Sequence, residues 1–173
     1  MLFYMILFHF ALHNSDMMVT METNFRSPLV TGCDCGFQLF NPVASLQVSH
    51  LGIYSDARFV GRSILMLDAH EEVLEELPEK LLAQFMLDAQ RSIKAIKDST
   101  GADRVNFAVL GNAVPHVHAH LIPRYREAEA KPNNSPWDDP RQKAALHEDE
   151  LKQLVEKMRN QLMSAVVAPE VTG

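Results

Sequence analysis

The segment 111–124, GNAVPHVHAHLIPR, constrains the fold of this chain more than any other part of its sequence. Within it, three histidines alternate with three apolar residues: His116, His118 and His120 with Val117, Ala119 and Leu121. Successive side chains of a β-strand point to opposite faces of the sheet. The alternation therefore predicts a strand over 116–124, with its apolar side in the core and all three imidazoles lining a surface or cleft.

Length and charge limit the class of protein. The 173 residues are predicted to form a single domain, since domains commonly have about 100–200 residues. Lys and Arg number 16 against 22 Asp and Glu, a net charge of −6, which disfavours binding of polymeric nucleic acid. The two cysteines, Cys33 and Cys35, are too few for a disulfide framework, so a reduced, cytoplasmic setting is expected.

The N-terminal segment is apolar but does not match a targeting or spanning sequence. Residues 1–13 are almost wholly apolar, but no Lys or Arg precedes Arg26. A signal peptide requires a basic region before its apolar run. The run is also shorter than the roughly 20 apolar residues that span a membrane. We interpret 1–30 as an extension outside the domain and expect no membrane partner, with a membrane tether as the alternative. The domain itself is placed at 31–166, followed by a flexible tail over 167–173.

The remaining sequence predicts an α+β fold. Strands are expected over 49–54, 61–68 and 105–110, besides 116–124. Apolar residues at three- and four-residue spacing predict an amphipathic helix from Pro78 to about Gly101, and a second helix around 151–162. Residues 126–142, rich in Pro, Asn and Asp, read as a long polar loop. Strands joined directly, with helices between the groups, favour an antiparallel sheet.

The histidine row, defined as His116, His118 and His120, permits three interpretations. A neutral imidazole can attack a phosphorus centre while its neighbours donate hydrogen bonds to the phosphate oxygens. Alternating histidines can also ligate zinc, although 103–125 offers only Asp103 as a further ligand. The third interpretation is a solvated strand face without chemistry. The first two correspond to an enzyme and to a non-enzymatic nucleotide- or metal-binding module.

The segment 116–122, HVHAHLI, resembles the signature of the histidine triad (HIT) family. The segment 61–67, GRSILML, followed by His70, resembles the glycine-led strand of that family. The resemblance implies a HIT-like fold: a five-stranded antiparallel sheet with a long helix packed on it and a C-terminal helix, usually in a homodimer. It also implies a nucleotide hydrolase or nucleotidyl transferase that acts at the α-phosphate of a nucleoside polyphosphate, ester or phosphoramidate.

The resemblance assigns roles to particular residues. His118 matches the nucleophile, and His120 matches the histidine that contacts the phosphate and the leaving group. His116 matches the first histidine, which helps to orient the other two. Asn112 falls where many members have a glutamine near the scissile bond, and Asn106 resembles a strand asparagine near the phosphate.

Several positions depart from the family pattern. Arg62 stands where many members have a fourth histidine, which keeps a donor and adds a permanent charge suited to phosphate. Ala113 replaces the serine of the branch that cleaves phosphoramidates. Asp56, or Ser55 beside it, is the expected contact of the ribose hydroxyls. Leu51 and Ile53 are the candidates for a wall against the nucleobase.

The other residues of interest have structural interpretations. Cys33 and Cys35 lack the Cys-x-x-Cys spacing through which some relatives bind zinc, so no metal or other cofactor is expected. His70 reads as a surface residue at a helix entry. Arg124 fits a salt bridge at the strand end as well as it fits a phosphate contact. Trp137, in the polar loop, is expected to pack against the sheet edge or a partner subunit, with a cover over the substrate as the alternative.

Overall fold

A computed structural model of the chain describes residues 29–30 and 35–167. The expectations for Cys33, for residues 1–28 and for the tail over 168–173 therefore lie outside the described residues. The last two residues of the expected extension, Leu29–Val30, form a short strand, β1, that pairs antiparallel with β2, Gln38–Leu39.

The main sheet has five antiparallel strands in the order β3-β4-β5-β7-β6. The strands are β3 (Pro42–Ser45), β4 (Ser49–Ile53), β5 (Ser63–Leu67), β6 (Arg104–Val109) and β7 (His118–Arg124). This architecture confirms the expected α+β, HIT-like fold. Four of the strands fall on the segments that the apolar pattern predicts. The fifth, β3, is a four-residue edge strand that begins with proline and has no alternation to reveal it.

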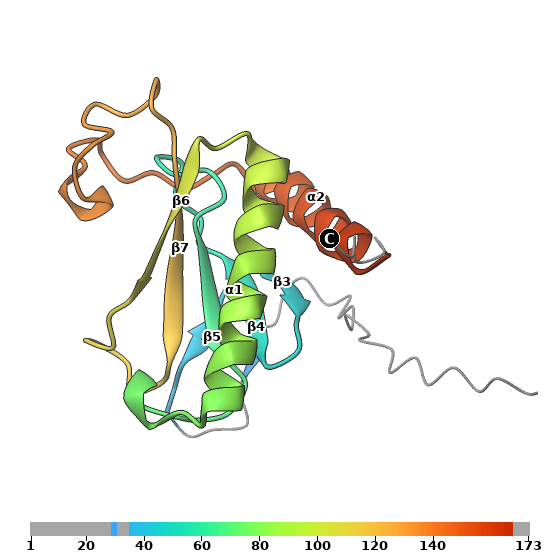
Figure 1. Ribbon diagram of the computed structural model, residues 1–173. Coiled ribbons are helices and arrows are strands. Elements are labelled where there is room, and N and C mark those ends of the chain that lie inside the picture. The colour runs from blue at the N-terminus through green and yellow to red at the C-terminus, as the bar shows by residue number, and fades with distance from the viewer. Residues whose placement is uncertain (1–28, 31–34, 168–173) are drawn as a thin grey trace, which may run out of the picture.

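Two long helices complete the fold (Figure 1). Helix α1, Glu79–Thr100, crosses one face of the sheet, and α2, Glu148–Val167, packs against both α1 and β3. Helix α1 ends where Gly101 adopts a left-handed conformation with φ of 70° and its N–H bonds to the carbonyl of Lys97. Two short 3₁₀ turns, Leu74–Glu76 and Pro136–Asp138, lie in the loops. Within the described residues, no helix is both long enough and apolar enough to cross a membrane.

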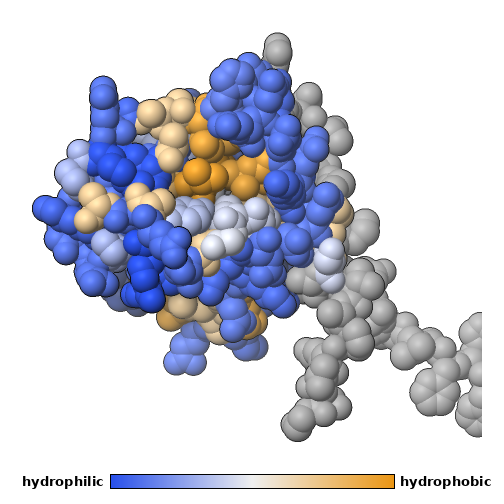
Figure 2. All heavy atoms as spheres, turned by 90° about the horizontal axis from the view of Figure 1, so that it is seen from above, coloured by the Kyte–Doolittle hydropathy of each residue, from blue (hydrophilic) through white to orange (hydrophobic). Residues whose placement is uncertain are grey.

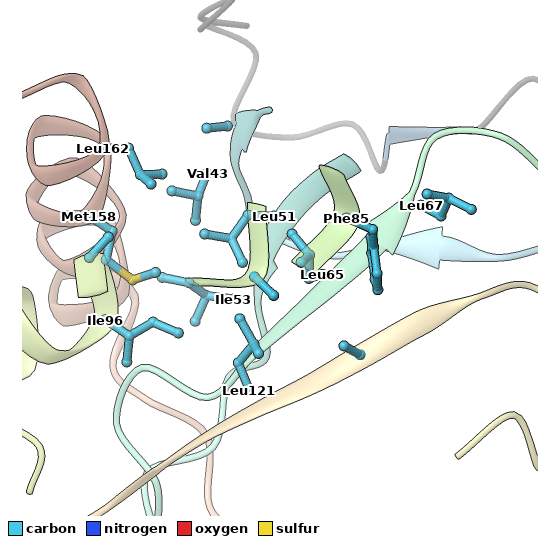
Figure 3. Close-up of a cluster of buried hydrophobic side chains, with 14 of the residues drawn as sticks. Val43, Leu51, Ile53, Leu65, Leu67, Phe85, Ile96, Leu121, Met158 and Leu162 are labelled. Atoms are coloured by element: carbon cyan, nitrogen blue, oxygen red, sulfur yellow. The ribbon is translucent and has the colours of Figure 1, made fainter. Parts of the chain in front are cut away.

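The hydrophobic core lies between the sheet and the two helices (Figure 3). It contains Val117, Ala119 and Leu121, all of which are buried, so the apolar side of the histidine segment faces the core as predicted. The even-numbered side chains of β7 consequently point to the opposite face of the sheet, which α1 does not cover.

The segment 37–40 crosses this second face close to the sheet. A Cβ atom on Gly52 in β4 would lie 2.5 Å from the carbonyl oxygen of Phe40 and 2.7 Å from Cγ of Leu39. Only glycine therefore allows the segment to approach this closely. The crossing forms one wall of the candidate site.

Candidate active site

His118 and His120 line a cavity of about 480 Å³ on the face of the sheet that α1 leaves free. Its walls are mainly apolar and come from the segment 37–40, the end of β4 and the loop over 110–114. Three of the lining side chains, Phe40, Tyr54 and Leu110, are large, apolar and exposed. A cavity of this size with apolar walls and a few converging polar groups is typical of a small-molecule site.

The protonation of His118 is set by the backbone. Its Nδ1 lies 2.7 Å from the carbonyl oxygen of His116, and a carbonyl can only accept a hydrogen bond. Nδ1 therefore carries the proton, and the neutral ring has its lone pair on Nε2. The residue is only 7% exposed, and the Phe37 ring packs at 5.0 Å between centroids. The ring is thus held in one orientation, with Nε2 as its unprotonated nitrogen.

His120 has a different environment. Its ring lies nearly perpendicular to that of His118, with 5.2 Å between centroids. Burial, aided by the neighbouring His118 and the Arg62 cation, lowers its pKa to about 4, so the ring is neutral near pH 7. Its Nδ1 is buried and has no hydrogen-bond partner among the described residues. No described protein group therefore fixes the tautomer of His120 through this nitrogen.

His116 does not line the cavity. It precedes β7, which begins at His118, so the predicted strand over 116–124 is two residues too long. The side chain is fully buried, and its Nε2 donates to the carbonyl of Leu67 at 2.7 Å. The prediction that all three imidazoles share one cleft is therefore wrong for His116, because the strand alternation starts only after it.

His116 instead belongs to a cluster with Cys35 and His70, which we call the Cys-His-His cluster. The ligand atoms of the three residues all lie within 4.8 Å of one another. Nδ1 of His116 lies 3.4 Å from Sγ of Cys35 and 3.4 Å from Nδ1 of His70. Thiolate and imidazole are ligands that zinc prefers, so this set could hold a metal ion. Sequence spacing did not reveal it, because its members come from three distant segments.

Asp56 anchors two arginines. Its carboxylate accepts hydrogen bonds from Arg58 at 2.9 and 3.0 Å and from Nη1 of Arg62 at 2.9 Å. Burial alone would raise the Asp56 pKa, but these donors outweigh it and the pKa is lowered. Asp56 is 3% exposed and lies outside the lining of the main cavity. The Arg62 guanidinium stands 4.8 Å from the centre of the Tyr54 ring.

The two asparagines lie in different places. Asn112 lines the cavity from the loop before the histidine row. Asn106, on β6, accepts a 2.7 Å hydrogen bond from Nη1 of Arg124. Arg124 is buried and forms a salt bridge with Glu129, so it supports the strand end, one of the two roles expected for it.

The apolar walls differ from those expected. Leu51 is buried in the core on the helix side, so its expected role at a nucleobase is wrong. Ile53 borders the cavity but is 1% exposed and belongs to the same core cluster. Phe37 and Phe40, which no sequence motif indicates, also line the cavity. Trp137 is 50% exposed and its ring lies edge-on to His120 at 6.1 Å, so it borders the site.

Comparison with known proteins agrees with this geometry. A family model described as the HIT domain matches residues 61–127, which include β5, α1 and the whole histidine row. This match identifies residues 61–127 as a HIT domain. Among curated proteins, an uncharacterized HIT-like protein of Methanocaldococcus jannaschii is 31% identical over 70 residues. That match covers 38% of this chain and 54% of the relative, so the chain spans about half the length of the curated HIT protein it matches.

Solved structures share the HIT fold. A histidine triad protein of Bradyrhizobium japonicum is 27% identical, with a TM-score of 0.63, over 70% of this chain and 89% of that one. The diadenosine triphosphate hydrolase of Plasmodium falciparum is 14% identical, with a TM-score of 0.51, over 75% of this chain and 80% of that one. The second likeness concerns the fold alone.

Proposed function

We propose that this HIT protein binds a nucleotide and cleaves it at the α-phosphate through a covalent bond to His118. The observation that carries the proposal is the hydrogen bond from Nδ1 of His118 to the His116 carbonyl, which leaves the Nε2 lone pair for attack. The HIT domain over residues 61–127 supports nucleotide binding in general. We propose in addition that the protein is a hydrolase or a nucleotidyl transferase.

The reaction proceeds in two displacements. Nε2 of His118 attacks the α-phosphorus, the N–P bond forms, and the bond to the leaving group breaks with its electron pair on the departing atom. That atom takes a proton from solvent. Water then attacks the phosphorus, the N–P bond breaks, and its electron pair returns to Nε2. The products are a nucleoside monophosphate and a released proton; an acceptor other than water makes the protein a transferase.

The cavity provides places for the two parts of a nucleotide. Phe37, Phe40 and Tyr54 offer aromatic surface for a nucleobase. His120 and Asn112 both line the cavity. In this proposal neutral His120 and the amide of Asn112 donate to phosphoryl oxygens, where negative charge increases during attack. Asp56 acts here as the anchor of Arg62, and a ribose contact from its carboxylate would compete with both arginines. Asn106 acts through its bond to Arg124.

The shared fold and the family resemblance indicate which substrates to test first. A solved neighbour of the same fold is named as a diadenosine triphosphate hydrolase, which makes dinucleoside polyphosphates the first substrates to test. Nucleoside phosphoramidates are the second class, as the family resemblance implies.

We also propose that the protein is a homodimer, from the family pattern, and that it is located in the cytoplasm, from the low cysteine content.

Intact-mass spectrometry tests the covalent mechanism directly. The protein is mixed with diadenosine polyphosphates, adenosine phosphoramidate and adenylyl sulfate, quenched in acid-free denaturant, and weighed. We expect an adduct of one nucleoside monophosphate on the parent chain and none on His118→Gly. An adduct on His118→Gly, or turnover by the parent without any adduct at short times, contradicts the proposal.

A second candidate function, metal binding, is favoured by the Cys-His-His cluster. We propose that Cys35, His70 and His116 contribute ligands to one zinc ion that ties the start of β7 to the segment after Cys35. The test is elemental analysis of protein purified without chelator, beside Cys35→Ser and His70→Ala. About one zinc per chain that both substitutions remove supports the site. Absence of zinc from the parent, or retention in both variants, rejects it.

A further inference from the structure

A second concave region lies beyond His120 on the same face of the sheet. Ile122, the next residue of β7 on this face after His120, lines a small pocket of about 90 Å³ together with Arg62, Trp137 and Lys143. A neighbouring pocket of about 260 Å³ also includes Arg62 and Lys143, and Tyr54 lines both this pocket and the main cavity. The two small pockets and the main cavity therefore share lining residues on this face of the sheet.

The region carries positive charge on a chain with a net charge of −6. Arg58 and Arg62 share one carboxylate, that of Asp56, and Arg141 is paired with Asp139. Lys143 adds a further cation and has no salt bridge among the described residues. Cations therefore outnumber carboxylates at this position. The Arg62 side chain is 15% exposed and close enough to His120 to lower the pKa of that ring.

Trp137 forms the rim between this region and the active site. Its backbone N–H bonds to Oγ of Ser135, which caps the short 3₁₀ turn at Pro136–Asp138. The indole meets His120 edge-on and remains half-exposed, so one face is available to a ligand. The end of the molecule seen in Figure 2 is predominantly hydrophilic around a smaller apolar area.

We propose that Arg62, Lys143 and Trp137 form a leaving-group subsite that selects an anionic phosphate chain. The inference rests on the proposed function, because it places the α-phosphate at His118 and the departing group beyond His120. A phosphate chain gains charge-assisted hydrogen bonds from Arg62 and Lys143. Trp137 covers that chain from the solvent side. An uncharged leaving group such as ammonia gains nothing there.

The kinetic test compares two substrates that share the adenylyl half. Diadenosine triphosphate releases an anionic nucleotide, whereas adenosine 5′-phosphoramidate releases ammonia. We expect Lys143→Glu to lower kcat/KM for diadenosine triphosphate about tenfold, because like charges then face each other, and to change the phosphoramidate value by less than about twofold. Lys143→Gln should give an intermediate loss, about threefold, as for an exposed ion pair.

Lys131→Glu is the matched control. It makes the same change of charge at an exposed position of the same long loop that lines none of the three cavities described. We expect it to behave as the parent with both substrates. Equal losses on the two substrates for Lys143→Glu, or the same selective loss for Lys131→Glu, would overturn the subsite.

Binding of inorganic tripolyphosphate separates this inference from the proposed function. We expect the parent and Lys131→Glu to bind it with similar affinity by titration calorimetry, and Lys143→Glu to bind it at least about fivefold more weakly. This result supports an anion subsite even if the parent cleaves neither nucleotide, which would refute the proposed function alone. No binding by the parent, or equal binding by Lys143→Glu, overturns the subsite.

Discussion

His118 and His120 border one cavity but differ in what their ring nitrogens contact, and this difference predicts different mutational effects. His118→Gly should abolish turnover while nucleotide affinity stays within a few-fold, because only the nucleophile is lost. His120→Ala should slow turnover by about 10²–10³-fold, the usual cost of one donor to a developing oxyanion. Steady-state kinetics with equilibrium binding measure both. A larger loss at His120 than at His118 would show that the nucleophile is misassigned.

The His120 ring should titrate far below an ordinary histidine. Burial, aided by the neighbouring His118 and the Arg62 cation, places its pKa at about 4, and ¹H–¹³C NMR of the ring against pH measures it. Arg62→Gln should raise this pKa by removing one neighbouring cation. Because the folded pKa lies below the unfolded value near 6.5, the stability from the neutral ring is complete above pH 6.5. It declines as the pH falls from 6.5 towards 4. A midpoint near 6.5 in the folded protein would contradict the burial of this ring.

At the scale of elements, the end of β7 is tied to the long loop by the salt bridge between Arg124 and Glu129. Both side chains are buried, and Arg124 also donates to the carbonyls of Pro132 and Asn134. Glu129→Ala should lower the free energy of unfolding by about 3–5 kcal/mol, because it leaves a buried cation without its partner. Urea denaturation measures this change. Glu127→Ala, an exposed position in the same loop, should change stability by less than about 0.5 kcal/mol.

The sequence reveals those elements whose pattern is local. Alternation locates β7, and the helical spacing of Leu82, Phe85, Ala89, Ile93 and Ile96 locates α1, because burial of one face leaves a periodic trace. The segment 37–40 leaves no periodic pattern in the sequence, because its contact with the sheet depends on Gly52 in a distant strand. The Cys-His-His cluster and the Trp137 contact likewise depend on tertiary packing. A motif thus predicts His118 and His120 in one cavity, but it does not predict the burial of His116.

At the scale of the whole molecule, the two edges of the sheet are not equivalent. At β3, Arg159 of α2 donates hydrogen bonds to the carbonyls of Val43 and Pro42, so the helix covers this edge. The other edge, β6, pairs only with β7 within the described residues. Uncovered edges favour pairing with another chain. We therefore expect a dimer that joins through β6, and light scattering at micromolar concentration should give twice the chain mass. A monomer at that concentration would contradict this arrangement.

The acceptor that fixes the proton on His118 is a main-chain carbonyl, an atom that every amino acid supplies. Replacing His116 removes an imidazole, yet the oxygen persists wherever the backbone keeps its course into β7. A substitution at position 116 can therefore replace the first histidine without changing the tautomer of His118. Only chemical synthesis reaches this atom, for instance an ester in place of the peptide bond that follows residue 116, whose weaker acceptor would let the imidazole turn.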